Sequence, residues 1–419
     1  MKIAIIGSGI SGLTAAYTLN RKHEISVFEA NNYIGGHTNT VDVHEQGTGR
    51  VIPVDTGFIV FNEKNYPNLC RLFNVLGVES RESDMSFSVH CQKSGLEYNG
   101  TDLNRIFSQR RNLVEVPFLI MLRDILRFHK QAPIALQRDI SDSISVDEFA
   151  RINSYGHRFV EHYLVPLGAS LWSCPAEKFR QFPIRFVLEF LNNHCMLQVD
   201  NRPQWRTVKG GSREYIEPLT ATFSGRIQLN TVVKKVRRRA GYVLVCFADG
   251  SEQTFDEVIL ATHADQSLSL VDDIDEEERN ILEKFPYQDN EVVLHTDTDL
   301  LPKHKRTWAS WNYRIPEDQR EHACLTYNMN MLQGIESEKT YCVSLNQTAD
   351  IDESSVIRKI NYHHPVFLPG RDIAQKEQHK LIQRRGLSYC GAYWGYGFHE
   401  DGVRSALAVC NAFNLEIAA

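Results

Sequence analysis

The chain has 419 residues, of which 42% are hydrophobic and 23% charged, a composition typical of globular proteins. Its net charge of −6 and the lack of a long basic tail argue against a nucleic-acid-binding protein. The nine cysteines include no Cys-x-x-Cys pair, so we interpret them as reduced thiols of a cytoplasmic protein. No apolar run has the length of a transmembrane helix, and the chain length predicts two domains.

The first residues predict a nucleotide-binding turn. Residues 2–6 are an apolar run typical of a buried strand, and the pattern Gly-x-Gly-x-x-Gly follows at once. Gly7 permits a tight turn, Gly9 leaves room for a pyrophosphate, and Gly12 lets the next helix pack closely. The helical pattern Leu13–Leu19 starts directly behind the turn, so its N-terminal amides would face the phosphates.

A second strand is predicted over Glu24–Ala30, with Glu29 near its end. A carboxylate at this spacing binds the hydroxyls of an adenosine ribose and disfavours a 2′-phosphate, so NADP is not expected. The alternative is a glycine-rich turn that binds nothing. The complete strand–helix–strand context favours a dinucleotide.

The segment after Glu29 distinguishes NAD from FAD. A nicotinamide enzyme would normally continue into a helix, whereas here Asn31–Thr40 (NNYIGGHTNT) contains the turn Gly35-Gly36. An extended segment, Val51–Asn62 (VIPVDTGFIVFN), follows with its own glycine at Gly57.

These motifs together resemble the flavin-containing amine oxidase superfamily. In that superfamily a Gly-Gly-Arg-x-x-Thr motif holds the FAD pyrophosphate, and a later Asp-x-Gly segment runs past the flavin ring. Gly35, Gly36 and Thr40 match the first motif, but His37 stands in place of the arginine. The resemblance implies an FAD-dependent oxidoreductase.

The replacement at His37 changes how phosphate would be held. A neutral imidazole offers one donor where guanidinium offers a charged fork. Phosphate binding is therefore expected to rest on backbone amides and the first helix. His37 itself is either a phosphate contact or a histidine of a surface loop.

The resemblance continues in the middle of the chain. A turn at Gly210-Gly211 precedes a helical pattern over Arg213–Phe223. A strand is expected over Arg226–Lys235, where the superfamily places a backbone contact to adenine at about Val233. A hairpin through Asp249-Gly250 and an apolar strand over 257–262 complete this part.

The C-terminal segment Leu387–Val409 reads as a strand, a glycine turn at Gly391, an aromatic loop and a helix from about Glu400. The resemblance implies that this helix points its N-terminal amides at the flavin. The usual Glu-Gly-Ala is Glu400-Asp401-Gly402 here, so the match is loose at this point.

The cofactor expected from these motifs is FAD, bound noncovalently, because no cysteine lies where the resemblance marks a flavin link. The expected cofactor-binding residues are Gly7, Ser8, Gly9, Ile10, Ser11, Gly12, Glu29, Ala30, Gly35, Gly36, His37, Thr38, Thr56, Gly57, Phe58, Val233, Gly391, Gly402 and Val403.

The predicted fold class is α/β, with a discontinuous Rossmann-like FAD-binding domain and an α+β substrate domain, as in amine oxidases. The FAD-binding domain would comprise residues 1–70, 205–270 and 386–419, and the substrate domain residues 71–204 and 271–385. Within the latter, Asn112–Lys130 and Val146–Leu164 are the clearest helical patterns, and strands at 291–295 and 341–345 predict a sheet over the flavin.

No catalytic residue is assigned. Because a flavin accepts a hydride at N5, the protein mainly has to orient a C–H bond and exclude water. Aromatic residues of the C-terminal loop could wall the substrate or simply form core, with Tyr396 nearest the place of the amine oxidase cage. These residues are Tyr393, Trp394, Tyr396 and Phe398.

Other conspicuous residues have simpler interpretations. Trp172 and His194 either face the cavity or are satisfied interior residues, and Lys209 is expected to be exposed beside a turn. The pair His363-His364 lacks metal-ligand spacing, so no metal site is predicted. The basic run Lys234–Arg239 is expected to form a solvated edge of a hairpin.

Three functional hypotheses remain. Residues 193–219 resemble a branch of the superfamily associated with cyclopropane-fatty-acid synthase-like lipid methyltransferases, which implies oxidation or desaturation of a lipid acyl chain. The second hypothesis is an amine oxidase acting on a soluble amine. The third is a non-catalytic flavin-binding partner of a lipid-modifying methyltransferase. The partners expected are thus a small-molecule or lipid substrate and such a methyltransferase, with no nucleic acid.

Arg110–Lys130 could also contact a membrane surface. Residues 118–122 are all apolar, while Arg123, Arg127 and Lys130 would share one helix face. A basic amphipathic helix of this kind can lie among lipid headgroups. The alternative is a largely buried helix with its cations in water.

Overall fold

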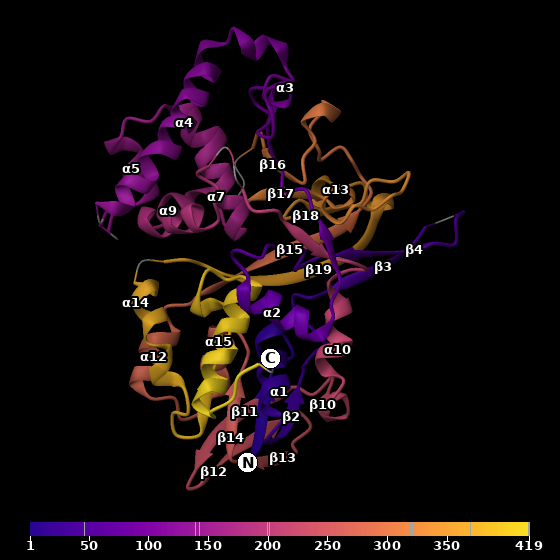
Figure 1. The fold of residues 1–419 in the computed structure, drawn as a ribbon, viewed down its shortest axis with the longest axis vertical. Coiled ribbons are helices and arrows are strands. Elements are labelled where there is room, and N and C mark those ends of the chain that lie inside the picture. The colour runs from indigo at the N-terminus through magenta and orange to yellow at the C-terminus, as the bar shows by residue number, and fades with distance from the viewer. Residues whose placement is uncertain are drawn as a thin grey trace.

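The computed structural model describes residues 1–45, 47–138, 140–141, 143–198, 200, 202–318, 322–368 and 370–417. Helices from residues 103–193 occupy one end of the molecule, whereas strands and further helices surround both chain termini at the other end (Figure 1). A large sheet lies between them (Figure 1).

The terminal half is built on a five-stranded parallel sheet in the order β10-β2-β1-β14-β20. Its strands are β1 Lys2–Ile6, β2 Glu24–Phe28, β10 Ile227–Gln228, β14 Glu257–Leu260 and β20 Leu387–Tyr389. Three distant parts of the chain therefore meet in one sheet. The predicted α/β class with a Rossmann-like parallel sheet is confirmed.

Both faces of this sheet are covered, which explains its apolar strands. Alternate residues of β1 point to opposite faces: Ile3 and Ile5 pack with α1 (Ile10–Leu19) and α15 (His399–Ala412). Ile6 and its neighbours pack against a three-stranded antiparallel sheet on the other face. Its strands are β11 Val233–Arg239, β12 Tyr242–Phe247 and β13 Glu252–Phe255.

The central sheet has seven strands in the order β19-β15-β18-β17-β16-β7-β8, antiparallel except where β16 pairs with β7. The strands are β7 Phe87–Cys91, β8 Leu96–Asn99, β15 Tyr287–His295, β16 Trp311–Ile315, β17 Cys324–Asn328, β18 Cys342–Leu345 and β19 Val356–Pro365. Two small sheets pair β3 Thr40–His44 with β4 Val51–Asp55, and β9 Arg206–Val208 with β5 Val60–Phe61 and β6 Ser80–Glu82.

The remaining helices come from two stretches of the chain. Those between residues 67 and 193 are α2 Pro67–Leu76, α3 Leu103–Ile106, α4 Val116–Gln137, α5 Val146–Ile152, α6 His157–Phe159, α7 Val165–Trp172, α8 Ala176–Arg180 and α9 Ile184–Asn193. The later ones are α10 Ile216–Thr220, α11 Ala264–Leu270, α12 Glu276–Leu282, α13 Met329–Gln333 and α14 Arg371–Lys376.

Two expected helices are shorter or broken. The pattern Val146–Leu164 is not one helix, because α5 ends at Ile152 and Ser154 adopts a left-handed φ of 51°. The helix resumes at His157 and continues as a π-helical turn over Val160–Leu164. Likewise Arg213–Phe223 contains only α10, after a 3-10 turn over Ser212–Tyr215.

One expected strand is two. Arg226–Lys235 divides into β10 and β11, which lie in different sheets. The chain turns between them at Asn230, whose φ is 53° and whose N–H donates to the Asn31 carbonyl. The predicted hairpin through Gly250 is confirmed, as are the strands that begin at Glu24 and Glu257.

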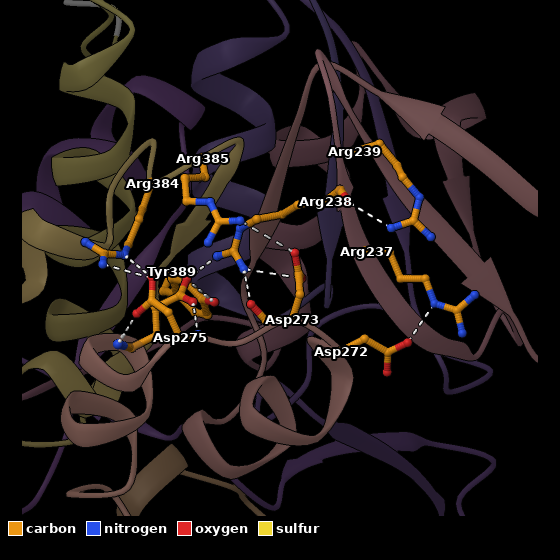
Figure 2. Close-up of polar contacts among 10 residues, drawn as sticks. Arg237, Arg238, Arg239, Asp272, Asp273, Asp275, Arg384, Arg385 and Tyr389 are labelled. Carbon is orange, nitrogen blue, oxygen red and sulfur yellow. Dashed lines mark hydrogen bonds and ion pairs between the residues drawn. The ribbon is translucent and has the colours of Figure 1, made fainter.

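The expectation that Lys234–Arg239 is a solvated edge was wrong for Arg238. Arg238 shares the inward face of β11 with Val236 and is 7% exposed. Its guanidinium donates to Asp273 and to the fully buried Glu278, which also accepts from the Tyr389 hydroxyl (Figure 2). The alternation of side chains along β11 directs this arginine inward, and the carboxylates of the buried Glu278 and the half-buried Asp273 balance its charge.

Candidate functional site

The first glycine turn has the geometry of a phosphate-binding loop. A Cβ at Gly12 would lie 2.0 Å from the Gly7 carbonyl oxygen, and one at Gly7 would lie 2.7 Å from the Ala261 oxygen. Gly7 also has a φ of 102°, which side chains rarely adopt. Gly9 is different: no heavy atom of the protein lies within 4 Å of its ideal Cβ position. The chain thus closes tightly on both sides of an open space at Gly9.

The N-terminus of α1 faces the same space. Its N-cap residue is Gly9, and among the described residues no side chain caps the helix. The amides of Ile10 and Ser11 therefore remain for an anion, in a helix whose dipole favours one.

A second glycine turn touches the first. The Gly35 amide donates to the Ser8 carbonyl at 3.1 Å, and Gly9 and Gly35 form a parallel bridge. A Cβ at Gly36 would lie 3.3 Å from the Gly9 Cα. The two turns that the sequence separates by 27 residues are one loop cluster in the structure.

Glu29 is held beside this cluster. It follows β2 and is 7% exposed, next to the exposed Ala30. Its Oε2 accepts hydrogen bonds from the Ser8 amide at 2.9 Å and the Ser8 hydroxyl at 2.7 Å, and its Oε1 accepts one from the Asn31 amide at 2.9 Å. A carboxylate oxygen accepts two hydrogen bonds, so Oε1 can take a ribose hydroxyl.

Val233 lies nearby through the backbone. The Thr231 amide donates to the Glu29 carbonyl at 2.8 Å, two residues before β11 begins at Val233. The expected ribose and adenine positions are therefore adjacent.

The segment Thr56–Phe58 runs along the second glycine turn. The Phe58 amide donates to the His37 carbonyl at 2.8 Å, and a Cβ at Gly57 would lie 2.2 Å from that oxygen. The Thr56 hydroxyl donates to the Asn39 carbonyl at 2.9 Å. Glycine is needed at position 57 because the two backbones are in contact.

The start of α15 reaches the same place. This helix begins at His399, one residue before the predicted Glu400, and the His399 ring stacks on Phe58 with centroids 3.8 Å apart. The His399 Nε2 lies 3.0 Å from the Thr38 hydroxyl, which also bonds the Tyr215 hydroxyl. Burial lowers the pKa of His399 to about 3, so its ring is neutral at pH 7.

Close packing explains the glycines of the C-terminal segment. A Cβ at Gly402 would lie 2.9 Å from Ile10 and Ser11, where α15 crosses α1, and the neighbouring Val403 is fully buried. The Gly391 amide donates to the Ser405 hydroxyl at 2.9 Å, and a Cβ there would lie 2.4 Å from the Tyr393 ring.

A group of histidines that the sequence did not bring together surrounds His37. The His37 ring stacks on Tyr362 with centroids 4.8 Å apart and lies 5.3 Å from His364 and 6.3 Å from His263. We call these four residues the histidine cluster. Burial lowers the pKa of His37 to about 4, and those of His263 and His364 to about 3. All three imidazoles are therefore neutral at pH 7.

His37 Nε2 is buried, and no described residue lies within hydrogen-bond distance of it. A buried polar atom without a partner is costly, so a ligand at this point would satisfy it. In the sequence this group is marked only by the adjacent pair His363-His364.

The aromatic loop divides between two surroundings. Tyr393 and Trp394 are buried core residues, with ring centroids 5.0 and 5.2 Å from that of Phe285. Tyr396 and Phe398 turn the other way and lie 5.3 and 5.4 Å from Phe190 of α9.

Other conspicuous residues contact neighbouring side chains. Trp172 is buried among the phenylalanines of α8 and α9, and the exposed Lys209 pairs with Glu79 at 2.7 Å. His194 stacks on Phe190 with centroids 3.9 Å apart, and burial lowers its pKa to about 4. In the described parts of the chain, no three His, Cys, Asp or Glu residues group closely enough to hold a metal ion. Across these same residues, no helix has both the length and the apolar character needed to span a bilayer.

The donor set fits an adenine dinucleotide. Open space at Gly9 and uncapped amides of α1 suit a pyrophosphate, while the anchored Glu29 suits a ribose. The unpaired Nε2 of His37 provides a further contact at the second turn.

Comparison with known proteins assigns the cofactor and the family. Residues 10–305 match the family of flavin containing amine oxidoreductases. AofH of Mycobacterium tuberculosis, named as a flavin-containing monoamine oxidase, is 24% identical over 60% of this chain. That match spans about half of AofH, namely 54%. A Staphylococcus aureus protein named 4,4′-diapophytoene desaturase is 25% identical over 39% of this chain and 35% of its own length.

Solved structures agree over almost the whole chain. Putrescine oxidase with bound putrescine superposes with a TM-score of 0.69 and 14% identity, covering 99% of each chain. A fatty acid isomerase from P. acnes that produces CLA superposes with a TM-score of 0.66 and 16% identity, covering 98% of each chain. These likenesses show the fold.

FAD supplies a hydride acceptor at flavin N5 when it is bound. The match covers most of the chain, and the glycine turns, Glu29 and α1 form the expected dinucleotide site. The protein therefore belongs to the flavin-containing amine oxidoreductase family, and its cofactor is FAD.

Proposed function

We propose that this enzyme oxidises or desaturates a lipid acyl chain by hydride transfer to flavin N5. The observation that carries the proposal is an aromatic wall, which we define as Phe186, Phe190, Tyr396 and Phe398. It joins α9 to the loop before α15, the helix expected to point at the flavin.

The aromatic wall is continuous and largely apolar. Tyr396 lies 5.3 Å from both Phe186 and Phe190, between ring centroids, and Phe398 lies 5.4 Å from Phe190. Phe367 extends it, 4.8 Å from Phe186. An acyl chain offers neither charge nor hydrogen bonds, so apolar walls are what hold and orient it.

A soluble amine would find little charge complement at the aromatic wall. The carboxylates whose charges act on Tyr396 belong to Glu189 and Asp401. Arg185 donates to Glu189 at 3.0 Å, and Arg404 donates to Asp401 at 2.9 Å. Both carboxylates are thus already neutralised.

The names of the similar proteins point to both lipid and amine substrates. The names of the desaturase and the fatty acid isomerase support chemistry on long hydrophobic chains within this fold. AofH and putrescine oxidase support an amine, which is therefore the alternative.

Segments that bind FAD and segments that bind the substrate alternate along the chain. In this proposal residues 1–70, 205–270 and 386–419 bind FAD, and residues 71–204 and 271–385 bind the substrate. FAD is held noncovalently, so denaturation should release it intact; a chromophore that stays on the chain would contradict this.

The resemblance to the methyltransferase-associated branch adds a proposed partner, a lipid methyltransferase of the cyclopropane-fatty-acid synthase type.

Anaerobic reduction of the bound flavin tests the substrate class. The holoprotein would be mixed with dispersed phospholipids and, separately, with soluble amines that include putrescine. Bleaching by the phospholipid and not by the amines is expected. Bleaching by amines alone would overturn the proposal in favour of an amine oxidase, and no bleaching by either would favour a non-catalytic flavin protein.

Two substitutions at Tyr396 test the role of the aromatic wall. Tyr396→Phe keeps the ring and should reduce the flavin at nearly the wild-type rate. Tyr396→Ala removes the ring and should slow reduction by the lipid roughly tenfold, a loss of about 1.4 kcal/mol in transition-state stabilisation. Equal rates in the two variants would remove the wall from the substrate path.

A further inference from the structure

Exposed hydrophobic side chains gather at one end of the molecule. In the described part of the chain, nine of the seventeen exposed large hydrophobic residues lie between positions 103 and 152. Most of these follow α3, where a 3-10 turn over Arg110–Leu113 leads into α4. This end is farthest from both chain termini (Figure 1).

The densest group forms what we call the tip surface, consisting of Leu113, Val114, Val116, Leu119 and Ile120. Val114 is 82% exposed and Val116 is 63% exposed. Single exposed apolar residues are ordinary, whereas a contiguous group marks a surface that is covered by a partner or a membrane.

The surroundings of the tip surface are basic, although the whole chain has a net charge of −6. Residues 103–137 contain six cations, namely Arg105, Arg110, Arg111, Arg123, Arg127 and Lys130. The two carboxylates of this range are Glu115 and Asp124. Glu115 pairs with Arg158 at 2.7 Å, and Asp124 is fully buried and pairs with Arg123 at 3.0 Å.

The structure places the membrane-contact candidate nearer the start of α4 than the sequence predicted. Arg123 and Arg127 were expected to present charge together from one helix face. Both instead contact Asp124, and Arg127 also stacks on the Tyr155 ring at 4.3 Å. The exposed apolar residues cluster before and within the first turns of α4, beside Arg110 and Arg111.

We propose that the tip surface docks on an anionic lipid membrane. Its aliphatic side chains would enter the headgroup region, and the neighbouring Arg110 and Arg111 would meet lipid phosphates. The composition favours lipid over protein, because the tip surface is entirely Leu, Val and Ile. Cores of protein interfaces are instead enriched in Tyr, Trp and Phe.

Docking goes beyond the proposed oxidation and does not depend on it. The tip surface shares no residue with the expected FAD-binding set or the aromatic wall. A failure to dock would leave the acyl-chain proposal standing, and an amine substrate would leave the docking proposal standing.

Flotation of the holoprotein with vesicles tests the proposal. Vesicles of phosphatidylcholine with phosphatidylglycerol would be compared with pure phosphatidylcholine at low salt. The protein should float with the anionic vesicles, and added salt should release it, because charge attraction is screened. No flotation with anionic vesicles at low salt would overturn the proposal.

A matched pair of double variants locates the contact. Val114→Ser with Val116→Ser should lower the vesicle partition coefficient roughly tenfold, which corresponds to about 1.4 kcal/mol. The control is Val232→Ser with Ile373→Ser, which removes exposed side chains elsewhere, Ile373 being 64% exposed. Thermal unfolding should be the same in all three proteins.

Two results would overturn the assignment of the tip surface. The first is flotation of Val114→Ser with Val116→Ser equal to that of the control. The second is a concentration-dependent dimer of the wild type that this double variant abolishes without any flotation, which would make the surface an interface between copies.

Discussion

Helices α1 and α4 bury their surfaces in opposite ways. Of the ten residues of α1 all but Tyr17 are buried, whereas only five of the 22 residues of α4 are. The groups of α1 that lack a partner among the described residues are polar, namely the uncapped amides that follow Gly9. Those of α4 are apolar, namely the exposed aliphatic side chains of its first turns. The kind of group left without a partner therefore indicates the ligand that we expect at each helix. The amides of α1 suit an anion, and the aliphatic side chains of α4 suit a lipid.

The contrast between a buried and an exposed residue of α4 should give the largest effect on the free energy of unfolding. Phe128 is fully buried against Phe149, Tyr155 and Phe159, while Leu126 is 60% exposed. Phe128→Ala should lower the free energy of unfolding by about 3–5 kcal/mol through the cavity it leaves. Leu126→Ala, two residues away, should change it by less than about 0.5 kcal/mol. Denaturant unfolding measures both, and similar losses would mean that the exposed face of α4 is packed.

The first turn of α1 offers a comparable pair. Gly12→Ala puts a methyl group against the Gly7 backbone and should destabilise the free protein by about 3 kcal/mol. Gly9→Ala is compatible with a φ of −69° and meets no protein atom, so unfolding of the free protein should be unchanged. Its methyl group instead occupies the expected phosphate space, which should weaken FAD binding roughly tenfold, about 1.4 kcal/mol. Wild-type FAD affinity in Gly9→Ala would place the pyrophosphate elsewhere.

Glu29 tests the polar side of the comparison directly. Glu29→Gln should weaken FAD binding by about 1.5–3 kcal/mol, the scale of a hydrogen bond to a charged group. Isothermal titration of the free protein with FAD measures this, and the fold should persist at saturating FAD. If the variant retains FAD as well as the wild type does, the ribose site has been misplaced.

The histidine cluster should give the smallest effect at pH 7, because its contribution appears only in acid. Native His37 stays neutral down to about pH 4, whereas unfolded histidine protonates at about 6.5. Between these values the unfolded state binds more protons, so the wild type should lose stability relative to His37→Gln as pH falls from 6.5 to 4. The slope should not exceed about 1.4 kcal/mol per pH unit.

Denaturant unfolding of both free proteins across this range gives the difference. Asp55 acts in the opposite direction, because burial raises its pKa to about 6, but it is common to both proteins and cancels. A difference that does not vary with pH would mean that His37 is solvated.

Prediction from sequence worked best where function constrains short segments. The positions of β1, α1 and β2 follow from the glycine spacing and two apolar runs, because these interactions are local. Prediction was poorer around Val146–Leu164, where the helix is interrupted beside Ser154. Arg127 of α4 bonds the Asn153 and Ser154 carbonyls there, a contact between segments that periodicity does not reveal.

The sequence by itself determined the parallel sheet, the glycine turns and the place of Glu29, since strand period and turn chemistry act over a few residues. Only the tertiary structure decided that Arg238 is buried and that the His37 ring lies near those of His263 and His364. It also decided that Tyr396 packs on α9 while Tyr393 packs in the core. Such contacts join residues that lie far apart in the chain. Their energies depend on burial and on partners from other elements, which no local pattern encodes.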